Sequence, residues 1–203
     1  MFDIYTFTFV LSIVSFTLAT VLTPGPNNIM MLSSGLNFGY KRTLPHMMGV
    51  AFGFAFMVVC VGMGINIIFE AYPFVYDIMK VVGFIYILWM AWQIANSSVD
   101  IKEDKNNKPF TFIQIVLFQW INPKAWIMAI TAISSFTVPS QDMFTQVLVI
   151  AFIYLLSGFI STNTWTLGGV FLKKLLKNKK AVKIFNISMA LLLVASIVPV
   201  IFE

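Results

Sequence analysis

Two polar interruptions inside long apolar segments carry the residues that could do chemistry. The first breaks the apolar run from Ile4 to Leu36 and consists of Thr23, Pro24, Gly25, Pro26, Asn27 and Asn28. Each proline lacks a backbone N–H and clashes with the carbonyl four residues earlier, so a helix that meets this stretch must free main-chain groups. The second consists of Asn122, Pro123 and Lys124. Freed carbonyls and N–H groups, amides and one ammonium group are suited to bind a small zwitterion.

A kink that serves only helix packing is the simpler interpretation of either interruption. Two prolines within three residues, followed by paired asparagines, favour a binding site, because lipid offers the freed main chain no hydrogen-bond partner. By helical rise, Lys124 lies about 20 Å from the basic edge of its span, where an unpartnered charge costs several kcal/mol. Either a substrate carboxylate or Asp77 would neutralise it.

Other spans also carry polar residues. The run from Ser161 to Thr166, with Asn163 and Trp165, shows polar groups on every helical face, which serves either interhelical hydrogen bonds or a cavity. Asp77 and Lys80 share one face and form either a simple ion pair or a gating or proton-coupling pair. We expect His46 at the cytoplasmic interface and Gly49 with Gly53 at a close helix contact. Helical counting brings four residues to a similar depth of about 15 to 18 Å, near the bilayer midplane: Gly25, Gly53, Asn122 and Asn163.

The apolar composition indicates an integral membrane protein. Of 203 residues, 59% are hydrophobic and 10% are charged, against about 25% charged residues in soluble domains. A span needs about 20 apolar residues, so the length allows five to seven spans and little else. The single Cys60 and single His46 exclude an intramolecular disulfide, a thiolate metal cluster and an imidazole cluster. We therefore expect no cofactor, no metal and no enzymatic activity.

The hydropathy pattern predicts one all-α transmembrane domain over residues 1–203. Its six predicted spans are Ile4 to about Leu36, Thr43–Phe69, Phe74–Asn96, Thr111–Phe136, Met143–Leu172 and Ala181–Phe202. A polar loop divides the chain into halves of about residues 1–98 and 109–203, with three spans each. Because three is odd, repeated halves must lie inverted relative to each other. The first helix of each half is broken at proline, which is typical of transporter binding sites.

Positive charge is confined to alternate loops. Eleven of the thirteen Lys and Arg residues lie in the first, third and fifth connections or just beyond them, and the other connections and both ends have none. The positive-inside rule then predicts that both termini are extracytoplasmic, in a bacterial cytoplasmic (inner) membrane. The lysine cluster from Lys173 to Lys183 could instead indicate nucleic acid or anionic lipid. Without interleaved aromatic residues the topology signal is favoured, so the expected partner is the lipid bilayer and not nucleic acid; a homo-oligomer stays open.

Several motifs resemble those of the LysE/RhtB family of amino-acid exporters. Residues 23–28 resemble its first-half signature, together with Ser33, Ser34, Gly35, Gly39, Gly49 and Gly53. The third-span pattern Lys80, Gly83, Tyr86, Trp89 and Trp92 and the segment Asn122–Ala125 resemble later motifs of the family. Within it, the chain looks most similar to the cysteine/O-acetylserine exporter group at Trp89–Ala95, at Ser134–Phe136 with Pro139, and at Asn163 with Trp165. Phe54 stands where many relatives have an acidic residue, which disfavours lysine or arginine as substrate.

The resemblance implies a secondary active exporter of small neutral amino acids or related zwitterions, coupled to the proton gradient by antiport. The expected substrate-binding residues are Pro24, Gly25, Pro26, Asn27, Asn28, Asn122, Pro123, Lys124, Asn163 and Trp165. Asp77 and Lys80 are the candidates for gating or proton coupling. An exporter of another small solute or of a metal cation is the main alternative, although a metal calls for clustered carboxylates or histidines. A membrane-embedded redox protein or enzyme would need a second cysteine or a nucleophile with its base.

Overall fold

The computed structural model describes residues 7–64, 73–97, 108–138, 142–176 and 178–196, with the side chains of residues 73, 75–77, 79 and 80 left out. Every regular element within these ranges is a helix. The eight helices are α1 (Phe7–Leu22), α2 (Pro26–Phe38), α3 (Tyr40–Gly62), α5 (Pro73–Asn96), α6 (Phe112–Ile121), α7 (Pro123–Phe136), α8 (Met143–Leu175) and α9 (Lys179–Ala195).

Both predicted helix breaks are present. The chain leaves helical geometry after Leu22 and α2 begins at Pro26, with a bend of 60° between the two axes. In the second half only Asn122 separates the end of α6 from the start of α7 at Pro123. Proline fits the first helical position, because its missing N–H has no partner there and its φ is already helical. The prolines therefore begin the second helix of each pair instead of bending a continuous one.

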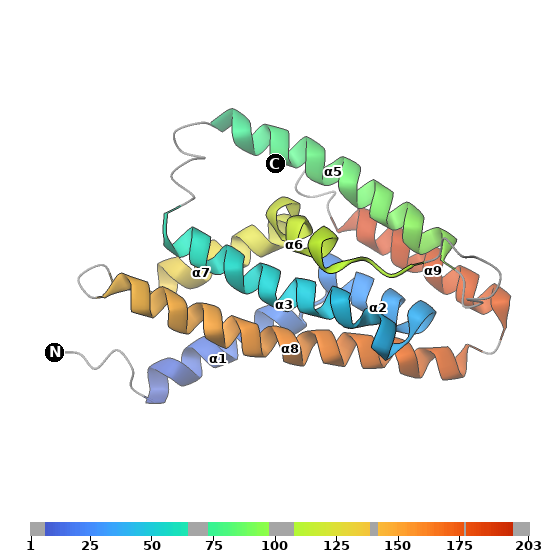
Figure 1. Cartoon of the computed structure of the whole chain (residues 1–203), viewed down its shortest axis with the longest axis horizontal. Coiled ribbons are helices and arrows are strands. Elements are labelled where there is room, and N and C mark those ends of the chain that lie inside the picture. The colour runs from blue at the N-terminus through green and yellow to red at the C-terminus, as the bar shows by residue number, and fades with distance from the viewer. Residues whose placement is uncertain (1–6, 65–72, 98–107, 139–141, 177, 197–203) are drawn as a thin grey trace.

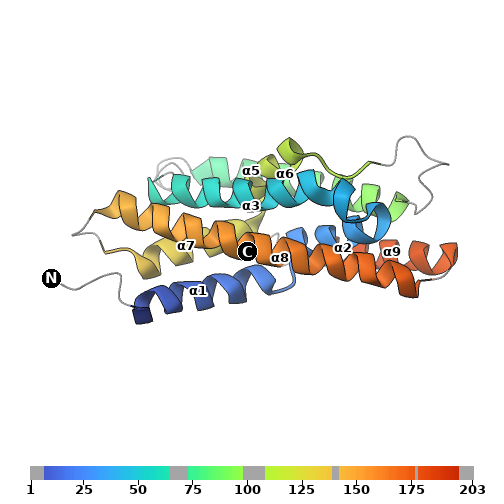
Figure 2. The same cartoon turned by 60° about the horizontal axis from the view of Figure 1, so that its bottom comes forward.

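The helices pack around a central pair of long helices. The long helices α3 and α8 lie side by side in the middle of the molecule (Figures 1 and 2). Helices α1 and α2 pack on α8, whereas α6 and α7 pack on α3. Helix α5 packs on α9. Each broken pair from one half is thus held by the long helix of the other half.

Glycines allow the closest of these contacts. A Cβ atom added at Gly35 on α2 would collide with the backbone of α8 at Thr166, and one at Gly169 on α8 would collide with the backbone of α2 at Leu32. A Cβ at Gly53 would lie 2.9 Å from the Cα of Val116 on α6. A residue larger than glycine at these positions would force the helices apart, as predicted for Gly49 and Gly53.

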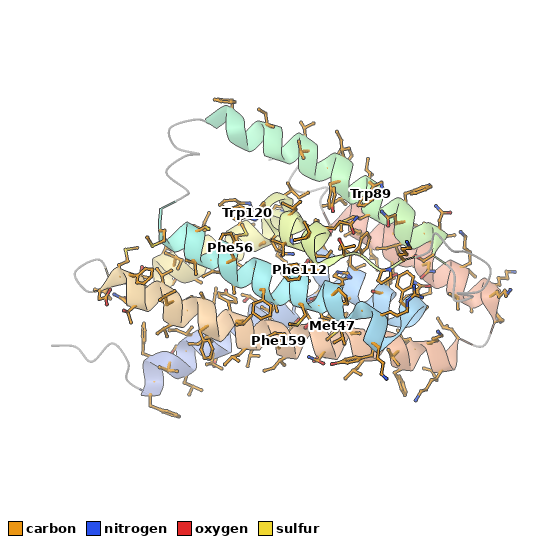
Figure 3. All side chains as sticks on the ribbon, in the orientation of Figure 1. Met47, Phe56, Trp89, Phe112, Trp120 and Phe159 are labelled. Carbon is orange, nitrogen blue, oxygen red and sulfur yellow. The ribbon has the colours of Figure 1, made fainter. Side chains whose placement is uncertain are left out.

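Two helices within the described ranges, α3 and α8, are long and apolar enough to cross a bilayer, and the bent pair α1–α2 counts as a third. Helix α3 begins at Tyr40, before the predicted Thr43, and α8 continues to Leu175, past the predicted Leu172. Residues 1–6, 65–72 and 197–203, at the ends of three predicted spans, lie outside the described residues. The outward surface is apolar: Phe56 of α3, which is 57% exposed, meets Trp120 of α6 edge to face (Figure 3).

One end of the molecule gathers the basic residues, and we call it the basic end. It contains the junction of α2 with α3, the last turn of α8, the start of α9 and the segment that leads into α6 (Figure 1). The basic residues described there are Lys41, Arg42, Lys108, Lys173, Lys174, Lys179, Lys180 and Lys183.

Candidate functional site

The two helix breaks face each other through Lys124. Its Nζ donates hydrogen bonds to the carbonyl oxygens of Thr23, at 2.6 Å, and Pro24, at 3.3 Å. Gly25 leaves room for this side chain, since a Cβ there would lie 2.8 Å from Lys124 Cδ. The ammonium group beside the second break thus donates hydrogen bonds to carbonyls that the first break leaves without helical partners.

Asn28 satisfies further carbonyls of the first break. Its Nδ2 donates to the carbonyl oxygens of Val21 and Thr23, both at 2.8 Å. Ser161 on α8 donates to the same Val21 oxygen at 2.7 Å and lies 3.4 Å from Asn28 Oδ1. Because Asn28 is buried and its amide is engaged, its observed role is to hold the end of α1 against α2 and α8.

Asn27, the adjacent residue, points toward α6 and pairs with Gln119. Asn27 Nδ2 donates to Gln119 Oε1 at 2.8 Å, and Gln119 Nε2 donates back to Asn27 Oδ1 at 3.3 Å. The Gln119 amide also donates to the carbonyl of Ile115 at 2.9 Å, within its own helix. This reciprocal amide pair, which we call the amide pair, joins the two broken helices beside the breaks.

A small cavity lies where the breaks meet, and we call it the central cavity. It offers about 40 Å³ of free space. Its lining comes from α1, α2, α3, the second break, α7 and α8: Thr20, Val21, Gly25, Pro26, Asn27, Asn28, Val50, Ala51, Phe54, Asn122, Lys124, Ala125, Met128, Tyr154, Gly158 and Ser161. The structure thus brings six of the predicted binding residues together: Gly25, Pro26, Asn27, Asn28, Asn122 and Lys124.

Asn122 contributes a free acceptor to this cavity. The residue is 2% exposed, and its Oδ1 has no hydrogen-bond partner among the described residues. The starts of α2 and α7 also lack a side-chain cap, so their positive dipole ends have no side-chain partner, although the Ala125 N–H bonds to the Asn122 carbonyl. The cavity therefore combines one ammonium group, two uncapped helix starts and one unpaired amide oxygen, with no Asp or Glu in its described lining.

The other predicted site residues lie elsewhere or outside the described side chains. Pro24 and Pro123 belong to the breaks, but their side chains do not line the cavity. Asn163 Oδ1 accepts a hydrogen bond from Tyr40 at 2.6 Å, and its Nδ2 donates to the Phe159 carbonyl. Trp165 packs on the core cluster that contains Met30 and Met31. Asp77 and Lys80 lie on α5, but their side chains are not among those described.

His46 lies near the basic end of α3, where its side chain is covered by protein. It is fully buried and meets Phe110 edge to face at 5.5 Å, and neither ring nitrogen has a partner among the described residues. The expectation came from its place near the end of a span. The structure adds that Phe110, in the segment before α6, packs against the ring, which the position in the sequence could not show.

Sequence reasoning missed several cavity residues. Tyr154 on α8 is 1% exposed, meets Phe54 edge to face at 4.9 Å, and lies 3.5 Å from the Thr20 hydroxyl. Thr20 and Ser161 could have been noticed, because one lies a turn before the first break and the other begins the polar run of α8. Tyr154 and Met128 carry no signal, since apolar and aromatic residues are common throughout this chain.

Two helices that are broken at proline and meet at a cavity are typical of transporter binding sites. The sequence matches the protein family described as LysE type translocator over residues 18–198, and the chain belongs to that family. It is therefore a multi-pass membrane protein of a transporter family and not an enzyme, and the resemblance drawn from the motifs is confirmed.

Similar curated proteins carry the name cysteine/O-acetylserine efflux protein. One from Escherichia coli (strain K12) is 31% identical over 182 residues, which cover 89% of this chain and 91% of that protein. One from Salmonella typhimurium (strain LT2) is 32% identical over 181 residues, with the same coverage. No solved structure matches the chain.

Proposed function

We propose that the chain is a secondary active exporter of small neutral amino acids or related zwitterions, such as cysteine or O-acetylserine, working as an antiporter with protons. The observation that carries this proposal is the joint presence of Lys124, the uncapped starts of α2 and α7, and Asn122 Oδ1 at one cavity. The relatives named above support the substrate class.

The two poles of an amino acid match two kinds of group in the central cavity. A substrate carboxylate would bind Lys124 Nζ and the first N–H groups of α2 and α7, where the helix dipoles also favour negative charge. The substrate ammonium group would donate to Asn122 Oδ1, an acceptor that is otherwise unpaired. Phe54 and the absence of a carboxylate in the described lining favour a neutral side chain over a second cationic group.

The small size of the central cavity supports a closed state of the transport cycle. A water molecule needs about 10–15 Å³ of such space, so about 40 Å³ holds roughly three waters and no amino acid. The cavity must therefore widen before substrate enters. Lys124 would then exchange its bonds to the Thr23 and Pro24 carbonyls for a bond to the substrate carboxylate.

We also propose six spans arranged as two inverted three-helix repeats. The helix contacts support this arrangement, because corresponding helices of the two halves make corresponding contacts. The pair α1–α2 packs on α8 as the pair α6–α7 packs on α3, and the equivalent helices α3 and α8 contact each other, as do α5 and α9. Two proline breaks in corresponding positions add to this pattern. Gathering of basic residues at one end supports extracytoplasmic termini in the inner membrane. A reporter fused at Glu203 tests the orientation, and cytoplasmic activity there would contradict it.

Transport in everted membrane vesicles tests the proposed function. Vesicles that contain the protein should accumulate labelled O-acetylserine or another neutral amino acid when a proton gradient is imposed, and labelled lysine should accumulate far less. Lys124→Met vesicles with equal amounts of folded protein provide the control. Accumulation of lysine in preference to every neutral amino acid would contradict the substrate class, and accumulation unaffected by a protonophore would contradict proton coupling.

A further inference from the structure

A second and larger cavity lies at the basic end, and we call it the basic-end cavity. It offers about 320 Å³ of free space between α2, the last turns of α5 and the segment before α6. Among the described residues its lining consists of Met30, Ser33, Ser34, Phe38, Trp92, Gln93, Ile94, Asn96, Ser97, Lys108 and Phe110. The central cavity includes none of these residues.

The two cavities differ in what they can hold. By the same volume per water molecule, the basic-end cavity accommodates roughly twenty waters, against roughly three in the central cavity. An amino acid is several times larger than a water molecule. Of the two cavities, only the basic-end cavity is therefore large enough for a small zwitterion in this conformation.

Helix α2 connects the two cavities along one face. Asn27 lines the central cavity, while Met30, Ser34 and Phe38 line the basic-end cavity at three, seven and eleven positions further on. That spacing keeps all four side chains on one stripe of the helix. From Asn27 to Ser34 the rise is about 10 Å. Asn27, which pairs with Gln119 of α6, and the fully buried Met30 are neighbours on this stripe, and each lines one of the two cavities.

The lining of the basic-end cavity offers opposite partial charges to the two poles of a zwitterion. Lys108, in the segment before α6, provides an ammonium group to the lining. Gln93 and Asn96 provide amide oxygens at the carboxyl end of α5, where the helix dipole is negative. A carboxylate is suited to the lysine side and an ammonium group to the α5 side.

We propose that the basic-end cavity is a loading site for a zwitterionic amino acid, which occupies it before the amide pair opens toward the central cavity. This inference rests on the proposed function, and it adds a site with its own charged residue, Lys108. The amide pair is the barrier between the two sites. Each amide of the pair needs another partner when it opens, which the polar groups of an entering substrate supply.

Protection from a thiol reagent tests the loading site. Cys60 is the only cysteine, so Cys60→Ser gives a cysteine-free chain into which Gln93→Cys is introduced. A charged, membrane-impermeant thiol reagent is added to everted vesicles with and without O-acetylserine, which has no thiol. At about ten times its Kd, O-acetylserine should slow labelling of Gln93→Cys about tenfold by mass action. Lys180→Cys, exposed at the same end but outside the cavity lining, should be labelled at an unchanged rate.

Two further variants separate the loading site from the central site. Protection of Gln93→Cys should persist in Lys124→Met, because the loading site does not contain Lys124, and should weaken in Lys108→Met. Loss of protection in Lys124→Met, or full protection in Lys108→Met, would overturn the proposal. Export of O-acetylserine without any protection would overturn the loading site alone, whereas protection without export would leave the loading site and contradict the proposed function. If Gln93→Cys does not fold, Ser97→Cys replaces it.

Discussion

The two helix breaks meet at one cavity, but they differ in whether their polar groups have hydrogen-bond partners. In the first break the carbonyls of Val21, Thr23 and Pro24 all accept hydrogen bonds, from the side chains of Asn28, Ser161 and Lys124. The second break is a single residue, Asn122. Its main-chain carbonyl accepts from the N–H of Ala125, but its side-chain oxygen has no partner in the described part of the chain.

This difference indicates that the two breaks have different roles. An acceptor that is buried without any partner costs about 1–3 kcal/mol, so one next to a cavity is expected to be used by a ligand, a water molecule or a movement. The carbonyl groups at the first break are therefore hydrogen-bonded, and one of their donors is the Lys124 ammonium group. We expect Asn122 of the second break and Lys124 in the first turn of α7 to supply the two groups for a zwitterion, an unpaired amide oxygen and an ammonium group.

Removal of the cation should have the largest effect on transport. Lys124→Met removes the carboxylate ligand, and a hydrogen bond to a charged group is worth about 1.5–3 kcal/mol, so efflux should fall roughly tenfold to a hundredfold. Lys124→Arg should keep part of the activity, since it keeps the charge in a larger, planar group. Efflux of labelled amino acid from vesicles with equal amounts of folded protein measures both. Lys180→Met, at the exposed start of α9, serves as the matched control.

A second variant separates this role from charge neutralisation. If Lys124 only compensates Asp77, Lys124→Met leaves a carboxylate unpaired, and the further change Asp77→Leu should restore efflux. We expect no recovery, because the described partners of Lys124 are the Thr23 and Pro24 carbonyls. Recovery in the double variant would reduce Lys124 to one half of an ion pair.

Asn28→Ala should destabilise the protein more than Asn27→Ala. The Asn28 amide serves two carbonyls of the first break, and their loss of a donor should cost about 2 kcal/mol in the free energy of unfolding. Asn27 pairs only with Gln119, at a site that is open to the central cavity. Thermal midpoints and the yield of folded protein in detergent compare the two variants. Equal losses of stability, or a larger loss in Asn27→Ala, would refute the scaffold role of Asn28.

Asn122→Ala should show the opposite pattern. Because Asn122 Oδ1 has no partner in the described structure, truncation removes an unsatisfied buried acceptor and should leave the thermal midpoint nearly unchanged. The apparent affinity for the transported amino acid should fall about tenfold, the equivalent of one hydrogen bond to the substrate ammonium group. Affinity comes from the concentration dependence of vesicle uptake. A lower thermal midpoint with unchanged affinity would make Asn122 a structural residue.

The sequence predicts the breaks well, because the restrictions that proline places on a helix are local. Pro26 and Pro123 each occupy the first position of a helix. The residues that satisfy the broken backbone could not be predicted from the same pattern. Ser161 lies more than a hundred positions from Val21, so their hydrogen bond depends on how α8 packs against α1.

The sequence indicates how far along a span a residue lies, but not which face of the helix its side chain occupies. Helical counting placed Asn163 at the depth of Asn122, but the run of polar residues in α8 shows polar groups on every face and cannot say which one meets the cavity. The structure turns Ser161 toward the first break and Asn163 toward Tyr40. His46 illustrates the same limit, since its burial depends on a distant segment that contains Phe110.

The smallest expected effect concerns the start of α8, which lies away from the breaks. Asp142 caps α8 by accepting from the N–H and hydroxyl of Thr145, and these bonds hold the pKa of its carboxyl group below its usual value. Because this pKa is lower in the folded than in the unfolded protein, the cap adds stability above the usual carboxyl range and loses it as the pH falls through the folded-state pKa.

Asp142→Ala should therefore lower the thermal midpoint slightly near neutral pH, and the difference from the unmodified protein should shrink as the pH falls from about 7 to about 3. The effect is small because the carboxylate is fully exposed and screened by solvent. Asn122→Ala, at the uncapped start of α7, should show no such dependence, since an amide does not titrate. A difference for Asp142→Ala that stays constant with pH would mean that its charge does not contribute to the cap.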